Sequence, residues 1–368
     1  MEIFSDLFGN VLNFTWQQAL MIAIGCLLVY LAVKREMEPS LLLPMGFGAV
    51  LVNLPMVHTE AIETLFHTGI ASELFPLLLF IGIGAMIDFG PLLSNPKMFL
   101  FGAAAQFGIF FTLVVAVMAG FDLKDAASAA IIAAADGPTS IYVANYFRST
   151  YQGAIMVAAY SYMALVPIIQ PPLIRAITTK KERMIRMEYA PGAVSKTTRI
   201  LFPIFVTVIA GTVAPKSAEL IGFLMFGNLI RECGVLDSLS QSAQHELANL
   251  ITLLLGLSVS FKMKAEWFVT WQTLLILGLG LVGFVFDTVG GVLFAKVLNL
   301  FSRRKVNPMI GAAGISAFPM ASRVVHKMGL EEDCGNFLLM HAAGANVSGQ
   351  IASVIAGGLM ITLVENIL

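Results

Sequence analysis

The chain has 368 residues, of which 58% are hydrophobic and only 12% are charged. A soluble domain has about 25% charged residues, so the composition excludes a soluble globular protein and predicts an integral membrane protein. The formal net charge is −1 and no basic tail occurs, which argues against nucleic acid as a partner.

Apolar stretches of membrane-spanning length recur along the chain, which predicts an all-α polytopic membrane protein without a separate soluble domain. Glu2 and Asp6 stand where a signal peptide would be basic, so we expect the first span to be retained. The spans expected in the first half are 16–33, 39–56, 75–93, 97–119 and 153–177, with a broken segment at 126–147.

The first broken segment reads Ala-Ala-Asp136-Gly137-Pro138-Thr139-Ser140. A carboxylate is costly to place among apolar residues, and Gly and Pro beside it interrupt the helical hydrogen bonds and free carbonyl oxygens. With the hydroxyl of Thr139, these oxygens suit Na⁺ or a proton and not zinc or copper. The alternative is that Asp136 caps a helix at a membrane edge.

Tyr162 lies in the span at 153–177, two residues after Tyr160. A phenol inside the membrane needs a hydrogen-bond partner and can relay a proton, but ordinary helix packing explains this position equally well.

A basic linker, residues 179–199, separates a first unit, 1–178, from a second unit, 200–368. In the second unit the expected spans are 200–214, 217–235, 248–263, 271–299 and 337–364, with a broken segment at 307–327.

The second broken segment offers neutral oxygens from Asn307, Ser316 and the backbone around Gly311, although packing of small residues would also explain these positions. Arg323 follows Ser316 by two helical turns, so the two side chains share a face. Its guanidinium could hold a carboxylate, or it could simply extend to the membrane surface. Asn346, in the last span, could reach the same site or bridge two helices.

The two units have similar short motifs in the same order. Gly46-Phe-Gly48 matches Met225-Phe-Gly227, Gly82-Ile-Gly84 matches Gly256-Leu-Ser258, and Pro138 matches Pro319. Basic loops are expected on the cytoplasmic side. The basic loops of the two units lie on that same side only if each unit crosses the membrane an odd number of times. The sequence therefore predicts about ten membrane crossings in two inverted repeats, each with a broken or re-entrant helix, the breaks meeting near the midplane and both termini outside. The loops that set this orientation are Lys34-Arg35, 178–199 and Arg303-Arg304-Lys305.

Five sequence blocks resemble the β-subunits of sodium-pumping biotin-dependent decarboxylases, which act on oxaloacetate, glutaconyl-CoA, methylmalonyl-CoA or malonate. The resemblance extends over essentially the whole chain. The blocks are Glu38-Pro39 through Pro44-Met-Gly-Phe-Gly48, Asp136-Gly137-Pro138-Thr139, Gly227-Asn228-Leu-Ile-Arg231-Glu232, Asn307-Pro308 through Ser316 and Arg323, and His341-Ala-Ala-Gly-Ala-Asn346.

The resemblance implies a subunit of the bacterial inner membrane that decarboxylates carboxybiotin and couples this to Na⁺ export with proton consumption. The biotin would be attached to a carrier partner and not to this chain. The other implied partners are a carboxyltransferase α-subunit, a small single-span γ- or δ-type subunit, surrounding membrane lipid and further copies of this chain.

The resemblance also implies residue roles. Asp136 would be the main Na⁺ ligand, and Arg323 would bind carboxybiotin and, with Tyr162 and Ser316, act in catalysis and coupling. Further positions of the Na⁺ site would be Asn307, Gly311, Ser316 and Asn346, to which the residue chemistry adds Thr139. Two rival functions remain: a stand-alone sodium-coupled carboxylate transporter, and a non-catalytic membrane anchor for soluble subunits.

Overall fold

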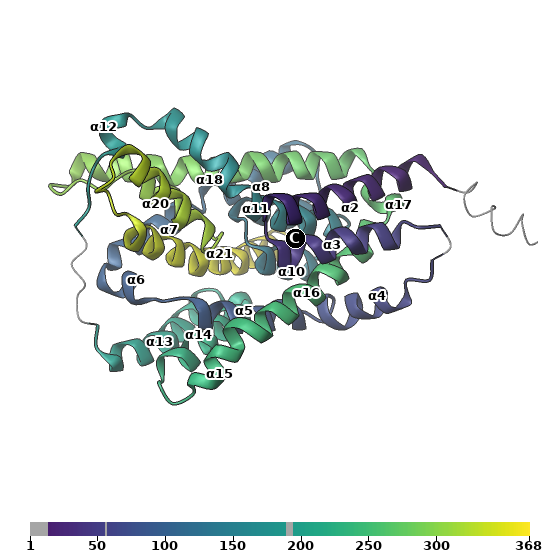
Figure 1. The fold of residues 1–368 in the computed structure, drawn as a ribbon, viewed down its shortest axis with the longest axis horizontal. Coiled ribbons are helices and arrows are strands. Elements are labelled where there is room, and N and C mark those ends of the chain that lie inside the picture. The colour runs from purple at the N-terminus through teal and green to yellow at the C-terminus, as the bar shows by residue number, and fades with distance from the viewer. Residues whose placement is uncertain (1–13, 56, 189–193) are drawn as a thin grey trace, which may run out of the picture.

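The structure, a computed structural model, describes residues 14–55, 57–188 and 194–368, and these residues form helices and no strands (Figure 1). Residues 1–13, where the sequence argues against a signal peptide and which include the N-terminus expected outside, lie beyond the described residues. So does residue 56, the last residue of the expected span 39–56.

The first unit contains short helices as well as long ones. Its elements are α2 (Trp16–Arg35), α3 (Pro39–Val52), α4 (Glu60–Leu65), η1 (Phe66–Ile70), α5 (Leu74–Met86), α6 (Gly90–Ser94), η2 (Pro96–Met98), α7 (Phe99–Ala104), α8 (Phe107–Met118), α9 (Leu123–Ala130), η3 (Ile131–Ala134), α10 (Gly137–Tyr146) and α11 (Gln152–Ile177).

The described part of the linker contains one short helix and the first turn of α13, and the second unit repeats the mixture of long and interrupted helices. The elements are α12 (Lys180–Arg183), α13 (Lys196–Val213), η4 (Pro215–Ser217), α14 (Ala218–Glu232), α15 (Asp237–Ser242), η5 (Ala243–Leu247), α16 (Ala248–Val259), η6 (Ser260–Met263), α17 (Ala265–Phe268), α18 (Trp271–Phe301), α19 (Met309–Ala312), α20 (Met320–Glu332) and α21 (Leu339–Ile367).

The described residues confirm an all-helical protein, and its long apolar helices fit a membrane protein. Within the described ranges 7 helices are long and apolar enough to cross a membrane, or up to 8 if the bent pair Glu60–Ile70 and Leu74–Met86 forms one span. Pro39–Val52 has 14 residues, fewer than the roughly 20 that a helix perpendicular to the membrane needs. The expected number of about ten crossings stays a prediction.

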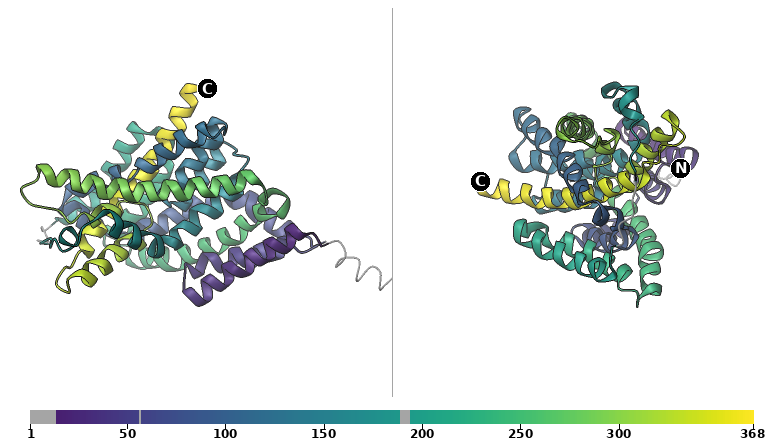
Figure 2. Two further views of the ribbon diagram at one scale, coloured as in Figure 1. Left: turned by 90° about the horizontal axis from the view of Figure 1, so that it is seen from above. Right: turned by 90° about the vertical axis from the view of Figure 1, so that its left-hand side faces the viewer.

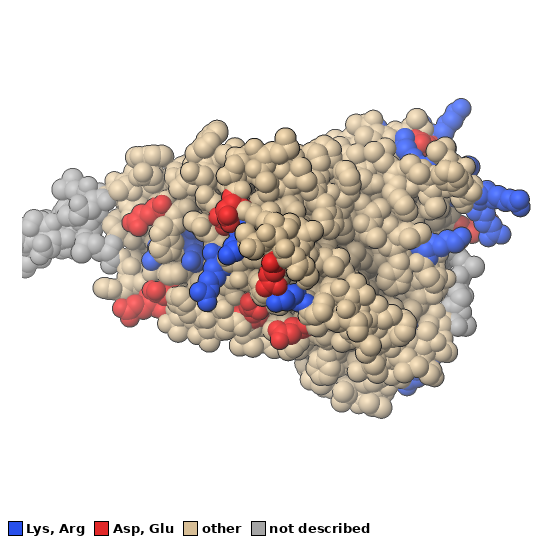
Figure 3. Space-filling view, turned by 180° about the vertical axis from the view of Figure 1, so that it is seen from behind, with Lys and Arg blue, Asp and Glu red and all other residues tan. Residues whose placement is uncertain are grey.

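On the face that Figure 3 shows, charged side chains form one group that extends from one end to the middle and a second group at the other end, and a broad area between the two groups lacks Lys, Arg, Asp and Glu. The linker helix α12 lies at one end, and α4 and α17 lie at the other (Figure 1). The two further views show long helices crossing between the ends, α18 among them (Figure 2). This distribution suits a bundle whose middle part is surrounded by lipid.

Two expected spans are interrupted. The span expected at 75–93 ends as a helix at Met86 and resumes at Gly90, because Pro91 cannot donate the hydrogen bond that a continuous helix needs there. The span expected at 97–119 is divided between α7 and α8 at Ala105–Gln106, where neither glycine nor proline occurs.

Asp287, in the middle of α18, stabilises this second interruption. Its buried carboxylate accepts hydrogen bonds from the backbone N–H groups of Gly108 and Ile109, in the first turn of α8. A side chain at Gly108 would bring its Cβ within 2.2 Å of the Gly283 carbonyl oxygen, so glycine is required for this approach. Asp287 thus caps a helix from a distant part of the chain.

Replacing Asp287 by alanine is expected to lower the stability of the protein by about 1–3 kcal/mol, because the buried N–H group of Gly108 would lose its acceptor. The midpoint of thermal aggregation of the detergent-purified protein measures this loss. Asp287→Asn keeps an acceptor oxygen and should retain most of the stability, and exposed Asp237→Ala is the control. An Asp287→Ala midpoint equal to that of the control would contradict the capping role.

Candidate functional site

The two broken segments meet. The Ser316 backbone N–H donates to the Ala134 carbonyl oxygen at 3.2 Å, and the Ser316 hydroxyl donates to Asp136 Oδ2 at 3.0 Å. On the first side, η3 ends at Ala134, Ala135 has φ of 50°, and α10 begins at Gly137. On the second side, residues 313–319 separate α19 from α20. The two broken segments, which the sequence predicts separately, therefore contact each other at one place.

Asp136 is the N-cap of α10. Thr139 donates to the carboxylate twice, from its backbone N–H to Oδ1 at 3.2 Å and from its hydroxyl to Oδ2 at 2.8 Å. Asp136 therefore caps a helix, as the alternative interpretation of the sequence proposed. It does not do so at a membrane edge, because Asp136 is only 3% exposed and lies inside the bundle.

Helix α21 completes the surroundings of Asp136 with two residues that sequence reasoning did not assign. Gln350 Nε2 donates to Asp136 Oδ2 at 3.1 Å, and the Ser353 hydroxyl donates to the same oxygen at 2.6 Å. The Ser353 and Ser316 hydroxyl oxygens are also 2.9 Å apart. The sequence contains a pattern that could have identified Gln350 and Ser353. With Asn346 they recur at helical spacing in an otherwise apolar span, which places them on one face of the helix.

Several buried oxygens close to these residues lack hydrogen-bond partners among the described residues. Asn346 donates from Nδ2 to the Ile315 carbonyl oxygen at 2.7 Å, but its Oδ1 has no such partner. The same holds for the hydroxyls of Ser140 and Tyr160. A buried polar atom is normally paired, so these oxygens indicate a site that can take another polar species.

A cavity of about 480 Å³, which we call the Asp136 cavity, connects this region with more exposed residues. Asp136, Tyr160, Ser316 and Gln350 line it together with Arg323 and Glu38. Tyr160 packs tightly here, because a Cβ at Gly137 would lie 2.2 Å from its ring.

Arg323, on α20, is exposed and lines the Asp136 cavity. Within the described part of the chain it forms no ion pair closer than 4.0 Å, so its guanidinium can bind a ligand. Its charge does act on Glu38, in the turn between α2 and α3. Burial raises the pKa of Glu38, and the positive charge of Arg323 opposes that rise.

Gly311 lies in a helix contact and not beside the carboxylate. A Cβ at Gly311 would be 1.9 Å from the Gly291 carbonyl oxygen, so the absent side chain lets α19 approach α18. The resemblance implies a position in the Na⁺ site for Gly311, whereas in the structure Gly311 lies in the contact between α18 and α19.

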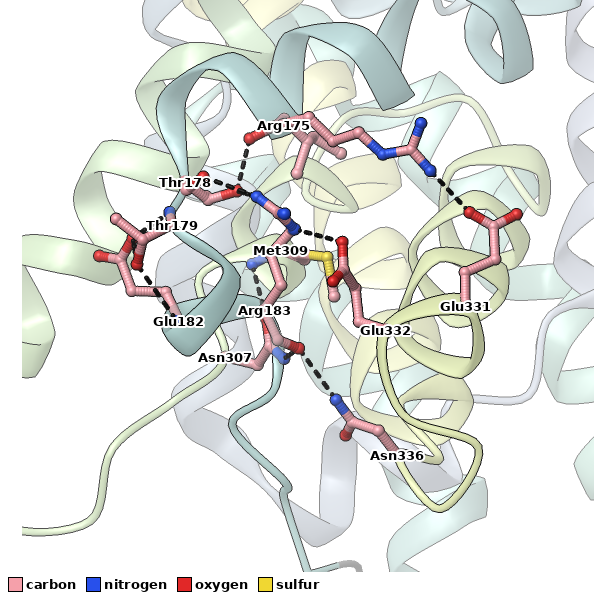
Figure 4. Close-up of polar contacts among 11 residues, drawn as sticks. Arg175, Thr178, Thr179, Glu182, Arg183, Asn307, Met309, Glu331, Glu332 and Asn336 are labelled. Atoms are coloured by element: carbon pink, nitrogen blue, oxygen red, sulfur yellow. Dashed lines mark hydrogen bonds and ion pairs between the residues drawn. The ribbon is translucent and has the colours of Figure 1, made fainter.

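Asn307 lies at the linker (Figure 4). Its Nδ2 donates to the carbonyl oxygens of Arg183 at 2.8 Å and Ile185 at 2.9 Å, and its Oδ1 accepts from the Met309 N–H at 3.0 Å. The structure does not bring it to the Asp136 cavity. Tyr162 also points elsewhere, since its hydroxyl donates to the Leu277 carbonyl oxygen on α18.

Comparison with known proteins assigns the chain to a family. Residues 17–364 match the family model described as the Na⁺-transporting oxaloacetate decarboxylase beta subunit. The chain is 48% identical to the glutaconyl-CoA decarboxylase subunit beta of Acidaminococcus fermentans, covering 95% of this chain and 94% of the relative. It is 47% identical to the methylmalonyl-CoA decarboxylase subunit beta of Veillonella parvula over 100% of both chains. It is 42% identical to a probable oxaloacetate decarboxylase beta chain of Vibrio cholerae, covering 96% and 97%. The chain therefore belongs to the family of beta subunits of Na⁺-transporting decarboxylases, and it is a decarboxylase subunit.

Proposed function

We propose that this subunit decarboxylates carboxybiotin presented by a biotin-carrier partner and couples the reaction to Na⁺ export with consumption of a proton. One observation carries the proposal: Asp136 is buried where the two breaks meet, surrounded by hydroxyl groups, and it shares a cavity with Arg323. The carboxylate suits a cation, and the guanidinium suits a carboxylated substrate.

The proposed Na⁺ ligands are oxygen atoms around Asp136. The hydroxyls of Thr139, Ser316 and Ser353 now donate to the carboxylate, but each also has lone pairs that can turn toward a cation. The unpartnered Oδ1 of Asn346 is a further candidate. A proton on Asp136 would neutralise the same charge, so Na⁺ and a proton would compete for this site.

Ser353 offers a specific test of this ligand set. Ser353→Ala is expected to weaken the apparent Na⁺ affinity of decarboxylation about two- to tenfold, the effect of removing one hydroxyl interaction. The Na⁺ concentration for half-maximal decarboxylation measures it. Ser348→Ala is the control on the same helix, because the Ser348 hydroxyl donates to the Met98 and Ala345 carbonyl oxygens instead. Equal Na⁺ dependence in the two variants would remove Ser353 from the site.

Arg323 is the proposed carboxybiotin contact, because a guanidinium can hold a carboxylate through two parallel hydrogen bonds. Ser316 would link this substrate to the cation, since its hydroxyl contacts Asp136 and its side chain lines the same cavity. Tyr162 would act in coupling through its bond to α18, while Tyr160 faces the cavity.

For the topology, we propose two inverted repeats, residues 1–178 and 200–368, about ten crossings, and a cytoplasmic linker at 179–199. The protein would lie in the bacterial inner membrane with its basic loops cytoplasmic and both termini outside. The packing supports a two-fold relation between the repeats. By their motifs α3 corresponds to α14 and α5 corresponds to α16, and the contact of α3 with α16 is matched by the contact of α14 with α5.

The proposed partners are a carboxyltransferase α-subunit, the biotin carrier and a small single-span γ- or δ-type subunit, with several copies of this chain in one complex. The relatives are named as beta subunits or beta chains, which supports an assembly with other chains.

The test is Na⁺ transport by the whole complex in inside-out vesicles. Oxaloacetate, glutaconyl-CoA, methylmalonyl-CoA and malonate are supplied in turn, and uptake of radioactive sodium is measured with and without avidin, which sequesters biotin. We expect uptake with one of these substrates and its loss with avidin. Sodium uptake that does not require decarboxylation, or that avidin does not reduce, would instead support the stand-alone transporter.

A further inference from the structure

A second cavity of about 550 Å³, which we call the lysine groove, lies between the linker and the last turns of α18, away from the Asp136 cavity. Its walls combine cationic and apolar side chains. The charged residues are Lys181, Lys296, Lys305 and Glu182, and the apolar ones are Ile185, Leu293, Val297 and Leu300.

The lysine groove carries excess positive charge. Lys296 pairs with Glu182 at 3.1 Å, which balances one lysine. Lys305 donates to the Asn299 carbonyl oxygen, a neutral partner, and Lys181 has no ion pair among the described residues. Two ammonium groups therefore remain without a counter-charge, enough for one phosphodiester anion.

The apolar side of the groove belongs to a helix long enough to cross a membrane. Val297 is 51% exposed and Leu300 is 78% exposed, and both lie in the candidate span Trp271–Phe301. Exposed apolar side chains directly beside lysines would contact acyl chains next to lipid head groups. A free phosphate ion would use the lysines but not this wall.

We propose that the lysine groove binds an anionic phospholipid, with the phosphate between Lys181 and Lys305 and the acyl chains along Val297 and Leu300. Basic pockets at the ends of membrane helices recognise such head groups. The site goes beyond the proposed Na⁺ chemistry and does not depend on it.

The position of the groove gives bound lipid a structural role. Glu182, on one wall, belongs to the linker, and the linker is held on the end of α20 by Arg183–Glu332 and Arg186–Asp333 ion pairs, both at 2.6 Å. Arg175–Glu331, at 2.7 Å, joins α11 to the same end of α20, which carries Arg323 (Figure 4). Lipid in the groove would therefore join α18 to the linker, which the ion pairs tie to the helix that carries Arg323.

The experiment measures the thermal stability of the delipidated, purified complex during titration with phosphatidylglycerol, phosphatidylcholine or inorganic phosphate. We expect saturable stabilisation by phosphatidylglycerol alone. The variant K181Q/K305Q should bind it about 25-fold more weakly, because each lysine near an anionic head group contributes roughly a factor of five. It leaves the Lys296–Glu182 pair intact but changes the Lys305 hydrogen bond to Asn299, so each protein's stabilisation by lipid is measured from its own lipid-free midpoint.

The matched control is K34Q/K180Q, which removes the same charge from lysines that do not line the groove. It should keep the affinity for phosphatidylglycerol. Equal weakening in both double variants would show a general charge effect and overturn the proposal. Competition by inorganic phosphate at similar affinity would show an ion site and also overturn it, as would unchanged lipid affinity in K181Q/K305Q.

Discussion

Replacing Asp136 by asparagine is expected to abolish Na⁺-dependent decarboxylation by the assembled complex. The side chain has nearly the same shape, but it loses the only charge among the groups that contact the proposed cation. Removing one charge of a buried pair costs about 3–5 kcal/mol. The apparent Na⁺ affinity should therefore fall by about two to four orders of magnitude, since roughly 1.4 kcal/mol corresponds to a tenfold change.

The measurement is the rate of decarboxylation of free carboxybiotin as a function of Na⁺ concentration. Asp122→Asn is a matched control, because Asp122 also caps a helix, α9, but is exposed. Asp136→Glu keeps the charge and should retain part of the Na⁺ response. If Asp136→Asn kept normal Na⁺ stimulation, Asp136 could not be the cation ligand and the proposed coupling would fail.

The broken segments were predictable because their causes are local. Gly137 and Pro138 follow Asp136 directly, and Pro319 lies in the second break, so the sequence itself contains the residues that interrupt each helix. The interruption between α7 and α8 could not be predicted in this way. The hydrogen-bond acceptor at this interruption, Asp287, is 179 residues away from Gly108 in the sequence, and a local sequence pattern does not predict so distant a contact.

The composition of the site was predictable only in part, for reasons of side-chain direction. Tyr160 and Tyr162 are two residues apart on α11, which turns their side chains about 200° away from each other. One lines the cavity and the other bonds to α18. Gln350 and Ser353 are ordinary polar residues in an apolar span until tertiary packing places them on Asp136. Asn307 is polar and next to a break, but the linker uses its amide.

Replacing Arg323 by glutamine is expected to weaken binding of the carboxylated substrate while leaving Na⁺ binding nearly unchanged. Arg323 contributes a charge to the Asp136 cavity but is absent from the hydrogen bonds around Asp136. A hydrogen bond to a charged group contributes about 1.5–3 kcal/mol, which corresponds to a roughly ten- to hundredfold rise in KM for carboxybiotin. Arg323→Lys keeps the charge but loses the planar fork, so it should restore only part of the affinity.

A substrate contact would change the affinity for carboxybiotin without changing the affinity for Na⁺, whereas an arginine with a structural role would change both. Lys327→Gln is the control, because Lys327 is a cation four residues further along α20 that does not line the cavity. Its KM should remain that of the unmodified protein. A loss of Na⁺ affinity as large as the loss of carboxybiotin affinity in Arg323→Gln would mean that Arg323 acts on the cation site itself. Carboxybiotin would then have to be held elsewhere in the Asp136 cavity, and the division of roles between Asp136 and Arg323 would be wrong.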